Sequence, residues 1–288
     1  MLGDGKTECW GKADLSGSST FQVASPPVEI LGLAEARSVS AGRDQACAVL
    51  ADGTAKCWGG NLFGALGNGS YASSVDAVPV TGLNGAIAIS AAVDHTCALS
   101  TGGAVSCWGE TWVDSVTAGD GTGRLTTTTQ PTPLAVSDIA DATMISSAFG
   151  YTCALLADAT IRCWGSNAHG TLGNGSSASS ASPVAVSALS SATAISAGDD
   201  HACALLQDGH VACWGSNESG QLGDGTQVSA ATPVAVVGIE NASAVSAGDA
   251  FTCALLANQT VRCWGETLPG CDTCAGYSLT PEAVQTNL

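Results

Sequence analysis

The tripeptide Cys-Trp-Gly recurs along the whole chain of 288 residues at a nearly regular spacing. Successive tryptophans are 48, 50, 56, 50 and 50 residues apart, at Trp10, Trp58, Trp108, Trp164, Trp214 and Trp264. A fixed period near fifty residues is typical of a solenoid, a propeller or another repeat array. Glycine or proline interrupts each period every few residues, and no ten residues show helical periodicity. Four short strand-like segments per period predict an all-β propeller of four-stranded blades.

The repeat predicts one propeller domain over residues 1–288, with six to seven blades. We place a partial first repeat and five full repeats at residues 1–30, about 31–80, 81–133, 134–183, 184–233 and 234–288. If the two ends were joined, the ring would lack fourteen residues, equivalent to 241–254, which hold one strand and one cysteine. The closing blade is therefore expected to be incomplete. Either the chain is an N-terminal truncation of a longer protein, which would also explain why no signal peptide is visible, or the ring is open.

Ten residues separate two cysteines in each of five repeats, at Cys47/Cys57, Cys97/Cys107, Cys153/Cys163, Cys203/Cys213 and Cys253/Cys263. A three-residue loop, Gln207-Asp208-Gly209, with Gly209 in the left-handed conformation, places Cys203 directly opposite Cys213. A two-residue loop would shift the register by one residue and separate the sulfurs. We therefore predict five cross-strand disulfides and an oxidising compartment. Reduced, buried cysteines and metal sites are the alternatives, although each pair lacks further ligands at a tetrahedral spacing.

Three cysteines fall outside these pairs. Cys271 and Cys274 form a Cys-x-x-Cys motif without the βαβ context of redox motifs, so we predict a local disulfide that pins a loop. Cys9 lacks a partner ten residues upstream. The sequence leaves open whether Cys9 is free or pairs with Cys271 or Cys274.

The net charge of the chain argues against two classes of binding partner. Asp and Glu outnumber Lys and Arg by 25 to 8, which gives a formal net charge of −17. Binding to nucleic acid or to anionic lipid requires clustered basic residues, so neither partner is expected. No run of eighteen apolar residues is present, so we expect no membrane span.

No set of residues indicates catalysis, a cofactor or a metal. His95 and His201 precede the first cysteine of their hairpins by two residues, where other repeats carry Gln45, Tyr151 and Phe251, so a packing or capping role is expected. Further acids lie in glycine-rich loops, at Asp199, Asp200, Asp224 and Asp249. Calcium binding is one reading of these acids, and turn hydrogen bonds are the favoured one. The Gly-x-Gly segments are read as turns between blades, because no helix follows them.

One repeat departs from the pattern. The interval between Trp108 and Trp164 contains six extra residues, which we interpret as a longer surface loop near residues 120–124. Trp112 lies in this irregular region and has no equivalent in the other repeats. The six repeated tryptophans are expected to pack between blades, whereas Trp112 is our candidate for an exposed binding anchor.

The repeat resembles that of the regulator of chromosome condensation (RCC1) family. The resemblance rests on a Gly-x-x-His segment, an apolar strand, an Asp-Gly turn, Trp-Gly and Gly-Gln-Leu-Gly-x-Gly, most complete at residues 197–226 and 61–70. It extends from Leu2 to Val284 and implies a propeller, typically of seven blades. The paired cysteines resemble those of bacterial, exported versions of the family. One relative is a plant photoreceptor whose signature tryptophans are replaced here, and another is a secreted bacterial inhibitor of β-lactamases.

The resemblance and the composition together predict a non-catalytic recognition scaffold, exported to the periplasm, the cell surface or the surroundings of a bacterium. Its expected partner is another protein or a cell-surface glycan. The alternative function is guanine-nucleotide exchange on a small GTPase, as in the eukaryotic namesake of the family, which would require a cytosolic location. We find no inserted wedge-like element in the sequence to support the alternative.

Overall fold

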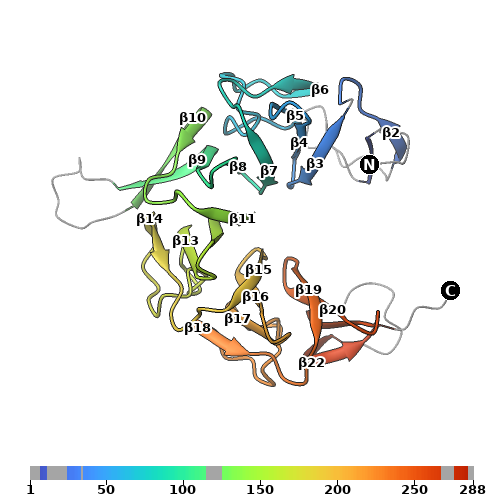
Figure 1. The fold of residues 1–288 in the computed structure, drawn as a ribbon, viewed down its shortest axis with the longest axis vertical. Helices are drawn as coiled ribbons and strands as arrows, with labels where there is room; N and C mark the ends of the chain where they lie inside the picture. The colour runs from blue at the N-terminus through green and yellow to red at the C-terminus, as the bar shows by residue number, and fades with distance from the viewer. Residues whose placement is uncertain (1–6, 12–24, 34, 115–124, 267–275, 285–288) are drawn as a thin grey trace. The chain divides into compact units, whose positions relative to one another are not determined.

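A computed structural model of the protein describes residues 7–11, 25–33, 35–114, 125–266 and 276–284. These residues form five four-stranded antiparallel sheets and one two-stranded sheet (Figure 1). Within this part of the chain, no helix has the length and hydrophobicity needed to cross a membrane. The prediction of an all-β fold made of four-stranded propeller blades is confirmed, whereas the total number of blades stays a prediction.

The chain divides into two compact units, Met1–Gly150 and Tyr151–Leu288, so the single domain stays a prediction. The first unit contains β1 (Glu8–Gly11), β2 (Ser25–Glu29), β3 (Ala36–Ala41), β4 (Gln45–Leu50), β5 (Ala55–Gly59), β6 (Ser74–Pro79), β7 (Ala86–Ala91), β8 (His95–Ser100), β9 (Val105–Asp114), β10 (Leu125–Ala135) and β11 (Ala142–Ala148). The second contains β12 (Tyr151–Leu156), β13 (Ile161–Gly165), β14 (Ser180–Ala185), β15 (Ala192–Ala197), β16 (His201–Leu206), β17 (Val211–Gly215), β18 (Ala230–Ala235), β19 (Ala242–Ala247), β20 (Phe251–Leu256), β21 (Val261–Glu266) and β22 (Tyr277–Ala283).

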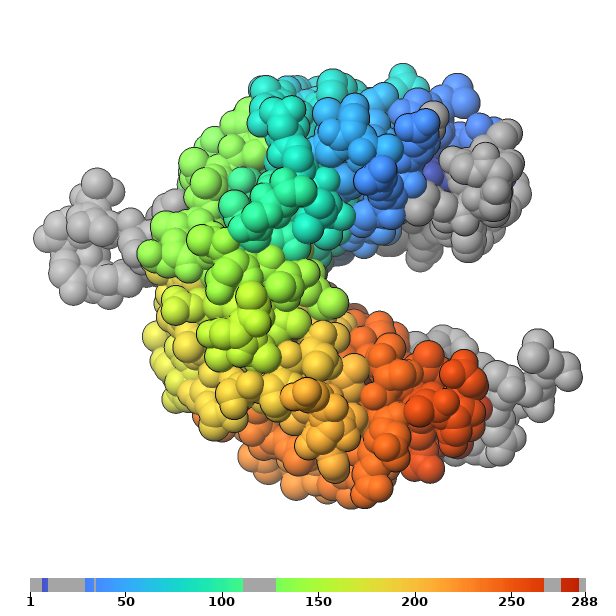
Figure 2. All heavy atoms as spheres, in the orientation of Figure 1, coloured from blue at the N-terminus to red at the C-terminus, as the bar shows by residue number. Residues whose placement is uncertain are grey.

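Each four-stranded sheet keeps its strands in chain order, as in the sheets β3-β4-β5-β6 and β15-β16-β17-β18. Every blade is therefore a simple meander. Consecutive blades of one unit pack directly against each other, since β7 lies beside β3 and β4, and β19 lies beside β15 and β16. Figure 2 shows atoms of successive colours in contact within each unit.

The central hairpin of each blade has the predicted register. Cys203 lies opposite Cys213, and Leu205 lies opposite Val211. Gly209 adopts a φ of 81° in the three-residue loop, and its N–H donates to the carbonyl of Leu206 at 3.0 Å. The spacing of ten residues therefore follows from the length of the loop.

All five predicted cross-strand disulfides are present, and none of these ten cysteines is reduced or left to bind a metal. Their Cα–Cα distances are 4.0–4.1 Å, in the pairs Cys47–Cys57, Cys97–Cys107, Cys153–Cys163, Cys203–Cys213 and Cys253–Cys263. The first four bridges are buried, as in Cys153–Cys163. Cys253 and Cys263, in the last four-stranded sheet of the chain, are half-buried. The last bridge is therefore the most accessible to solvent.

The cysteines outside these pairs have separate outcomes. Cys9 is a half-buried free thiol in β1, where burial raises its pKa. It packs against a core cluster that contains Trp58. Cys271 and Cys274 lie outside the described residues, so their predicted bridge stays a prediction.

Disulfides and tryptophans from neighbouring blades share the same cores. Cys47 and Cys57 of one blade lie in a cluster with Trp108 of the next blade. Cys203, Cys213 and Trp264 form the same arrangement in the second unit. The expectation that the repeated tryptophans pack between blades is confirmed at these positions.

Each of these tryptophans also makes a polar contact with the preceding blade. The indole N–H of Trp108 donates to the carbonyl of Ala65 at 2.8 Å. Trp214 and Trp264 donate in the same way to Thr171 and Gln221, at 2.8 and 2.9 Å. The indole N–H is thus satisfied in a buried position, which a buried tryptophan requires.

Glycines complete this contact on both sides. Gly223 lies under Trp264, where an added Cβ would be 2.6 Å from the indole nitrogen. Gly215, which follows Trp214, has a φ of 107°, and an added Cβ would be 2.6 Å from the carbonyl oxygen of Asp200. The repeated Trp-Gly and Gly-x-Leu-Gly segments are therefore steric requirements of one interblade joint.

Gly223→Ala should destabilise the protein more than Gly238→Ala. The two glycines have nearly equal φ angles, +67° and +69°, but nothing lies within 4 Å of an added Cβ at Gly238. The control should lose about 1–2 kcal/mol through the left-handed backbone alone. Gly223→Ala should lose about 1–3 kcal/mol more, because the methyl group overpacks against Trp264. Urea denaturation followed by tryptophan fluorescence measures the difference, and equal losses would contradict the steric explanation.

Candidate interaction surface

One repeated position joins neighbouring blades through side chains of different chemistry. Gln45 donates from Nε2 to the carbonyl of Ala92 in the next blade at 2.9 Å. The Tyr151 hydroxyl lies 2.8 Å from the carbonyl of Gly198 and 2.6 Å from that of His201. The side chains of Gln45, Tyr151 and His201 are all buried. This position therefore serves to connect blades.

His201 occupies the same position and is held in one tautomer. Its Nε2 lies 2.7 Å from the hydroxyl of Thr252, which itself donates to the carbonyl of Gln221 at 3.0 Å. The hydroxyl must therefore accept a hydrogen bond from Nε2–H. Nδ1 is buried beside Gly198 without a hydrogen-bond partner in the described part of the chain.

Burial lowers the pKa of His201 to about 4, and it lowers the pKa of His95 to the same value. Both imidazoles are uncharged at neutral pH and enclosed by protein. The structure agrees with the packing role expected for these two histidines.

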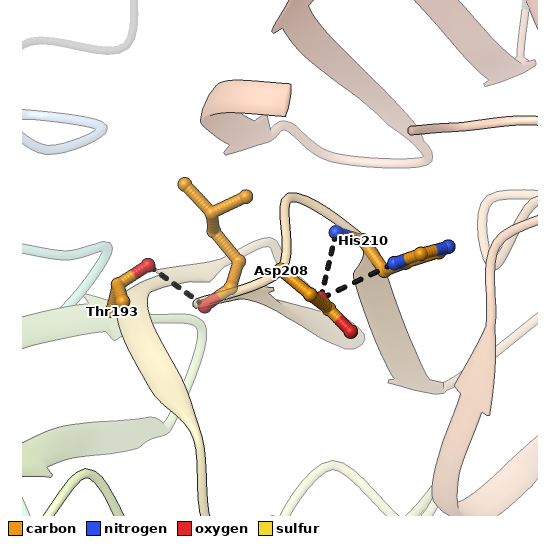
Figure 3. A network of polar contacts seen from close by, with 4 residues as sticks. Thr193, Asp208 and His210 are labelled. Carbon is orange, nitrogen blue, oxygen red and sulfur yellow. Dashed lines mark hydrogen bonds and ion pairs between the residues drawn. The ribbon is translucent and has the colours of Figure 1, made fainter. Parts of the chain in front are cut away.

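The remaining histidines lie at the surface. His210 is half exposed at a hairpin tip, where its Nδ1 is 3.2 Å from Asp208 (Figure 3). Its backbone N–H also donates to the Asp208 carboxylate at 3.1 Å, which lowers the pKa of Asp208. Thr193, nearby in Figure 3, donates to the carbonyl of Leu205 at 3.2 Å. His169 is exposed in a loop of its own blade. The Asp208–His210 pair is thus part of a turn.

Loop carboxylates also make turn contacts. Asp224 accepts hydrogen bonds from the N–H of Thr226 at 2.9 Å and from the Asn217 amide at 3.1 Å. The Asn217 amide oxygen accepts in turn from the N–H of Leu222 at 2.9 Å. In the described ranges, no three His, Cys, Asp or Glu side chains are grouped so that they could hold a metal ion.

The blade with six extra residues is built differently from the others. β9 and β10 contain 10 and 11 residues, and they pair from Asp114↔Leu125 to Gly109↔Gln130. β8 begins at His95, opposite Gly109, and does not continue beside the rest of β9. Residues 110–114 and 125–129 therefore form a two-stranded extension, which we call the β9–β10 arm. Figure 1 shows the two strands continuing outward beyond β7 and β8.

This arrangement corrects one prediction and leaves another open. The longer surface loop expected near residues 120–124 lies outside the described residues and stays a prediction, while the strands on either side are longer than in the other blades. Trp112 was expected in an irregular loop. It lies within β9, directly opposite Thr127 of β10. No inserted wedge-like element was indicated by the sequence. The structure contains an inserted strand pair, the β9–β10 arm. The available signal was the high strand propensity of Trp112, Val113 and the four threonines at 126–129.

The base of the arm is polar and negatively charged. The backbone N–H of Glu110 donates to the carbonyl of Asp94 at 2.8 Å. Burial, followed by the negative charge of Glu110, raises the pKa of Asp94, and Arg43 acts in the opposite direction. The half-exposed Tyr71 of the preceding blade places its hydroxyl 3.2 Å from that of Thr129 in β10.

Comparisons with known proteins agree on the repeat. Two family profiles match the chain, and each is described as a regulator of chromosome condensation (RCC1) repeat. The first matches residues 36–65 and residues 192–221, and the second matches residues 161–205 and residues 208–255. No curated protein sequence matches the chain significantly.

Solved structures of low sequence identity share the fold. Prp20p from Saccharomyces cerevisiae, a protein with binding properties to Gsp1p and histones, is 17% identical, with a TM-score of 0.72 over 87% of this chain. The chain spans 65% of that protein. Human WBSCR16 is 19% identical, with a TM-score of 0.78. The match covers 96% of this chain and 76% of the WBSCR16 chain.

The two buried histidines predict that stability falls in acid. In the unfolded chain they should titrate near pH 6.5, and in the folded chain near pH 4. Between these values only the unfolded state binds the protons, so stability decreases as pH falls from 6.5 to 4, by of order 3 kcal/mol per histidine.

His201→Gln, which copies the side chain of Gln45, should remove about half of this pH dependence. Urea midpoints measured at pH 7 and pH 4.5 on the wild type and the variant provide the test. Identical changes with pH in the two proteins would show that His201 does not titrate as described.

Proposed function

We propose that this chain, a propeller built from RCC1-type repeats, is a non-catalytic recognition protein that is exported from a bacterial cell and binds another protein. The β9–β10 arm is the proposed contact element. One observation carries the proposal: the arm is a strand pair that extends one blade beyond the pattern of the other four.

The side chains that recur among the repeats make contacts that hold the fold together. The β9–β10 arm, which has no equivalent in the described parts of the other blades, is therefore the distinctive surface. Trp108, Trp214 and Trp264 of the Trp-Gly segments donate to neighbouring blades. The amides of Asn61, Asn167 and Asn217 hold their own loops. His201 is buried in an interblade contact. These commitments support a recognition role in preference to an enzymatic one.

Trp112 is the proposed anchor of the interface. Tryptophan is enriched among residues that dominate binding energy, because its large ring is rigid and carries a hydrogen-bond donor. Leu62 of the preceding blade, 79% exposed, and Tyr71 add apolar and aromatic surface to the same unit.

The disulfides support export. Five bridges in one chain indicate an oxidising, extracellular type of environment, because thiols are kept reduced in the cytosol. Location in the periplasm, at the surface or outside a bacterial cell is part of the proposal.

Guanine-nucleotide exchange on a small GTPase is the second candidate, favoured by the fold shared with Prp20p, which binds Gsp1p. The five disulfides argue against it, because that reaction takes place in the reducing cytosol. Acceleration of nucleotide release from a small GTPase by the purified chain would support it.

Thiol counting tests the proposed location. The chain has 13 cysteines, of which ten lie in the five disulfides. Protein taken from its native compartment and denatured without reductant should expose at most the other three, Cys9, Cys271 and Cys274. Thirteen reactive thiols would contradict export and favour the exchange factor.

Trp112→Ala should weaken recognition strongly without loss of stability. We expect twelve-residue peptides selected from a random display library on the wild-type chain to bind the variant about thirtyfold more weakly. The melting transition should be unchanged, because Trp112 lies beyond the four-stranded part of its sheet. Trp112→Phe is the matched control and should retain much of the affinity.

Peptides that bind the wild type and Trp112→Ala equally would contradict the arm as the contact element. A glycan array run with the same two proteins tests the other partner class. Glycan binding that depends on Trp112, without any such peptide, would show that the ligand is a carbohydrate.

A further inference from the structure

The outer edge of β10 is the longest strand edge among the described four-stranded sheets. β10 is the terminal strand of the sheet β10-β9-β8-β7 and contains 11 residues. The corresponding outer strands β6, β14, β18 and β22 contain 6, 6, 6 and 7 residues. The main-chain groups on a strand edge form a template for pairing with another chain.

The register identifies which main-chain groups face this edge. Cys97 and Cys107 are 4.1 Å apart at Cα, which marks a non-hydrogen-bonded pair, so the main chain of Cys107 faces β10. The N–H and C=O groups of Gly109, two residues later, also face β10. Those of Glu110 face the side of β8, where its N–H donates to the carbonyl of Asp94.

Because main-chain groups face alternate sides along a strand, this pattern also shows which residues of β10 direct their N–H and C=O groups away from β9. Glu110↔Thr129 and Trp112↔Thr127 are then non-hydrogen-bonded pairs, so the N–H and C=O groups of Thr127 and Thr129 face outward. The Tyr71 hydroxyl, 3.5 Å from the carbonyl of Thr129, approaches from that outer side. Thr126, by contrast, uses its main chain to pair with Val113.

The edge is not protected in the ways that proteins normally use. Thr126–Thr129 is an uncharged run of high strand propensity, and the strand contains no lysine. Protection begins at Thr129, whose carbonyl accepts from the Tyr71 hydroxyl at 3.5 Å, and continues at Pro131, whose carbonyl accepts from the N–H of Gly69 at 2.8 Å. The outward groups of Leu125 and Thr127 precede this point.

The charge around the edge is negative. Glu110 and Asp114 lie on β9, and neither β9 nor β10 contains a lysine or arginine. At the base of the arm, Asp94 and Asp44 add carboxyl groups and Arg43 adds one positive charge, while the chain as a whole carries −17. A complementary partner segment is therefore basic.

We infer that the β9–β10 arm binds an extended, positively charged polypeptide segment as an additional strand along the outer edge of β10. Main-chain hydrogen bonds to the N–H and C=O of Thr127 and to the N–H of Thr129 supply the pairing, and the acids of β9 and the arm base favour basic side chains. This inference rests on the proposed recognition function and specifies its geometry and its partner class.

Thr127→Pro and Thr127→Ala form the matched test, made in the full chain. Proline removes the outward N–H and breaks no hydrogen bond in the ladder to β9, whereas alanine keeps that N–H. The display-selected peptides that depend on Trp112 serve as probes in fluorescence anisotropy. We expect binding within about twofold of the wild type for Thr127→Ala and about tenfold weaker for Thr127→Pro. Selected peptides should be rich in lysine and arginine, and their affinity should fall with salt.

Amide exchange measured by NMR on the wild type provides a test that needs no variant. The Thr127 and Thr129 amides should exchange more slowly in the complex, and the Thr126 amide should not change. Equal binding by the two Thr127 variants, or slowed exchange at Trp112 and Asp114 instead, would overturn strand addition to β10 while leaving the proposed function intact.

Two further results would count against the inference. Concentration-dependent dimerisation that Thr127→Pro prevents, seen by sedimentation, would assign the edge to a second copy of the chain. Selected peptides without basic residues would overturn the partner class. The absence of any peptide that depends on Trp112 would overturn both the inference and the proposed function.

Discussion

At three joints between blades, a buried indole donates a hydrogen bond to a main-chain carbonyl of the preceding blade, and the fit of these neighbouring blades depends on this contact. Trp108, Trp214 and Trp264 all make this bond at 2.8–2.9 Å while nearly or fully buried. The indole can approach the preceding blade only because a glycine, such as Gly223 under Trp264, leaves room for the ring. The chain can adopt a positive φ after the tryptophan only because a glycine follows it, as Gly215 follows Trp214. Most of the recognisable motif therefore describes a single joint.

Cross-links compensate for the small size of the side chains that form this fold. The sequence contains 36 glycines, and much of each interblade core consists of alanine, valine and cysteine. A bridge across each central hairpin restricts the unfolded chain, by about 2–3 kcal/mol for a loop of this size. Because the sulfurs also lie in the cores with Trp108 and Trp264, each bridge fills space that a larger side chain would otherwise occupy.

The repeat made most of the fold predictable. The spacing between Cys203 and Cys213 allowed only one hairpin register, and the position of Trp214 after a cysteine placed it on the opposite face. The half-buried state of Cys253 and Cys263 was not predictable, because their spacing is identical to that of the buried pairs. The β9–β10 arm was missed because six extra residues counted along the chain do not reveal whether a loop or its flanking strands lengthen.

The acceptor in the tryptophan joint is a main-chain oxygen, contributed by Ala65, Thr171 and Gln221 in three different blades. A substitution at these positions changes the side chain and leaves the oxygen in place. A repeat copied or exchanged by recombination would therefore meet the same acceptor in any neighbour. At these three junctions, the tryptophan contact therefore places no demand on the side chain of the acceptor residue, and sequence there can drift without loss of the joint.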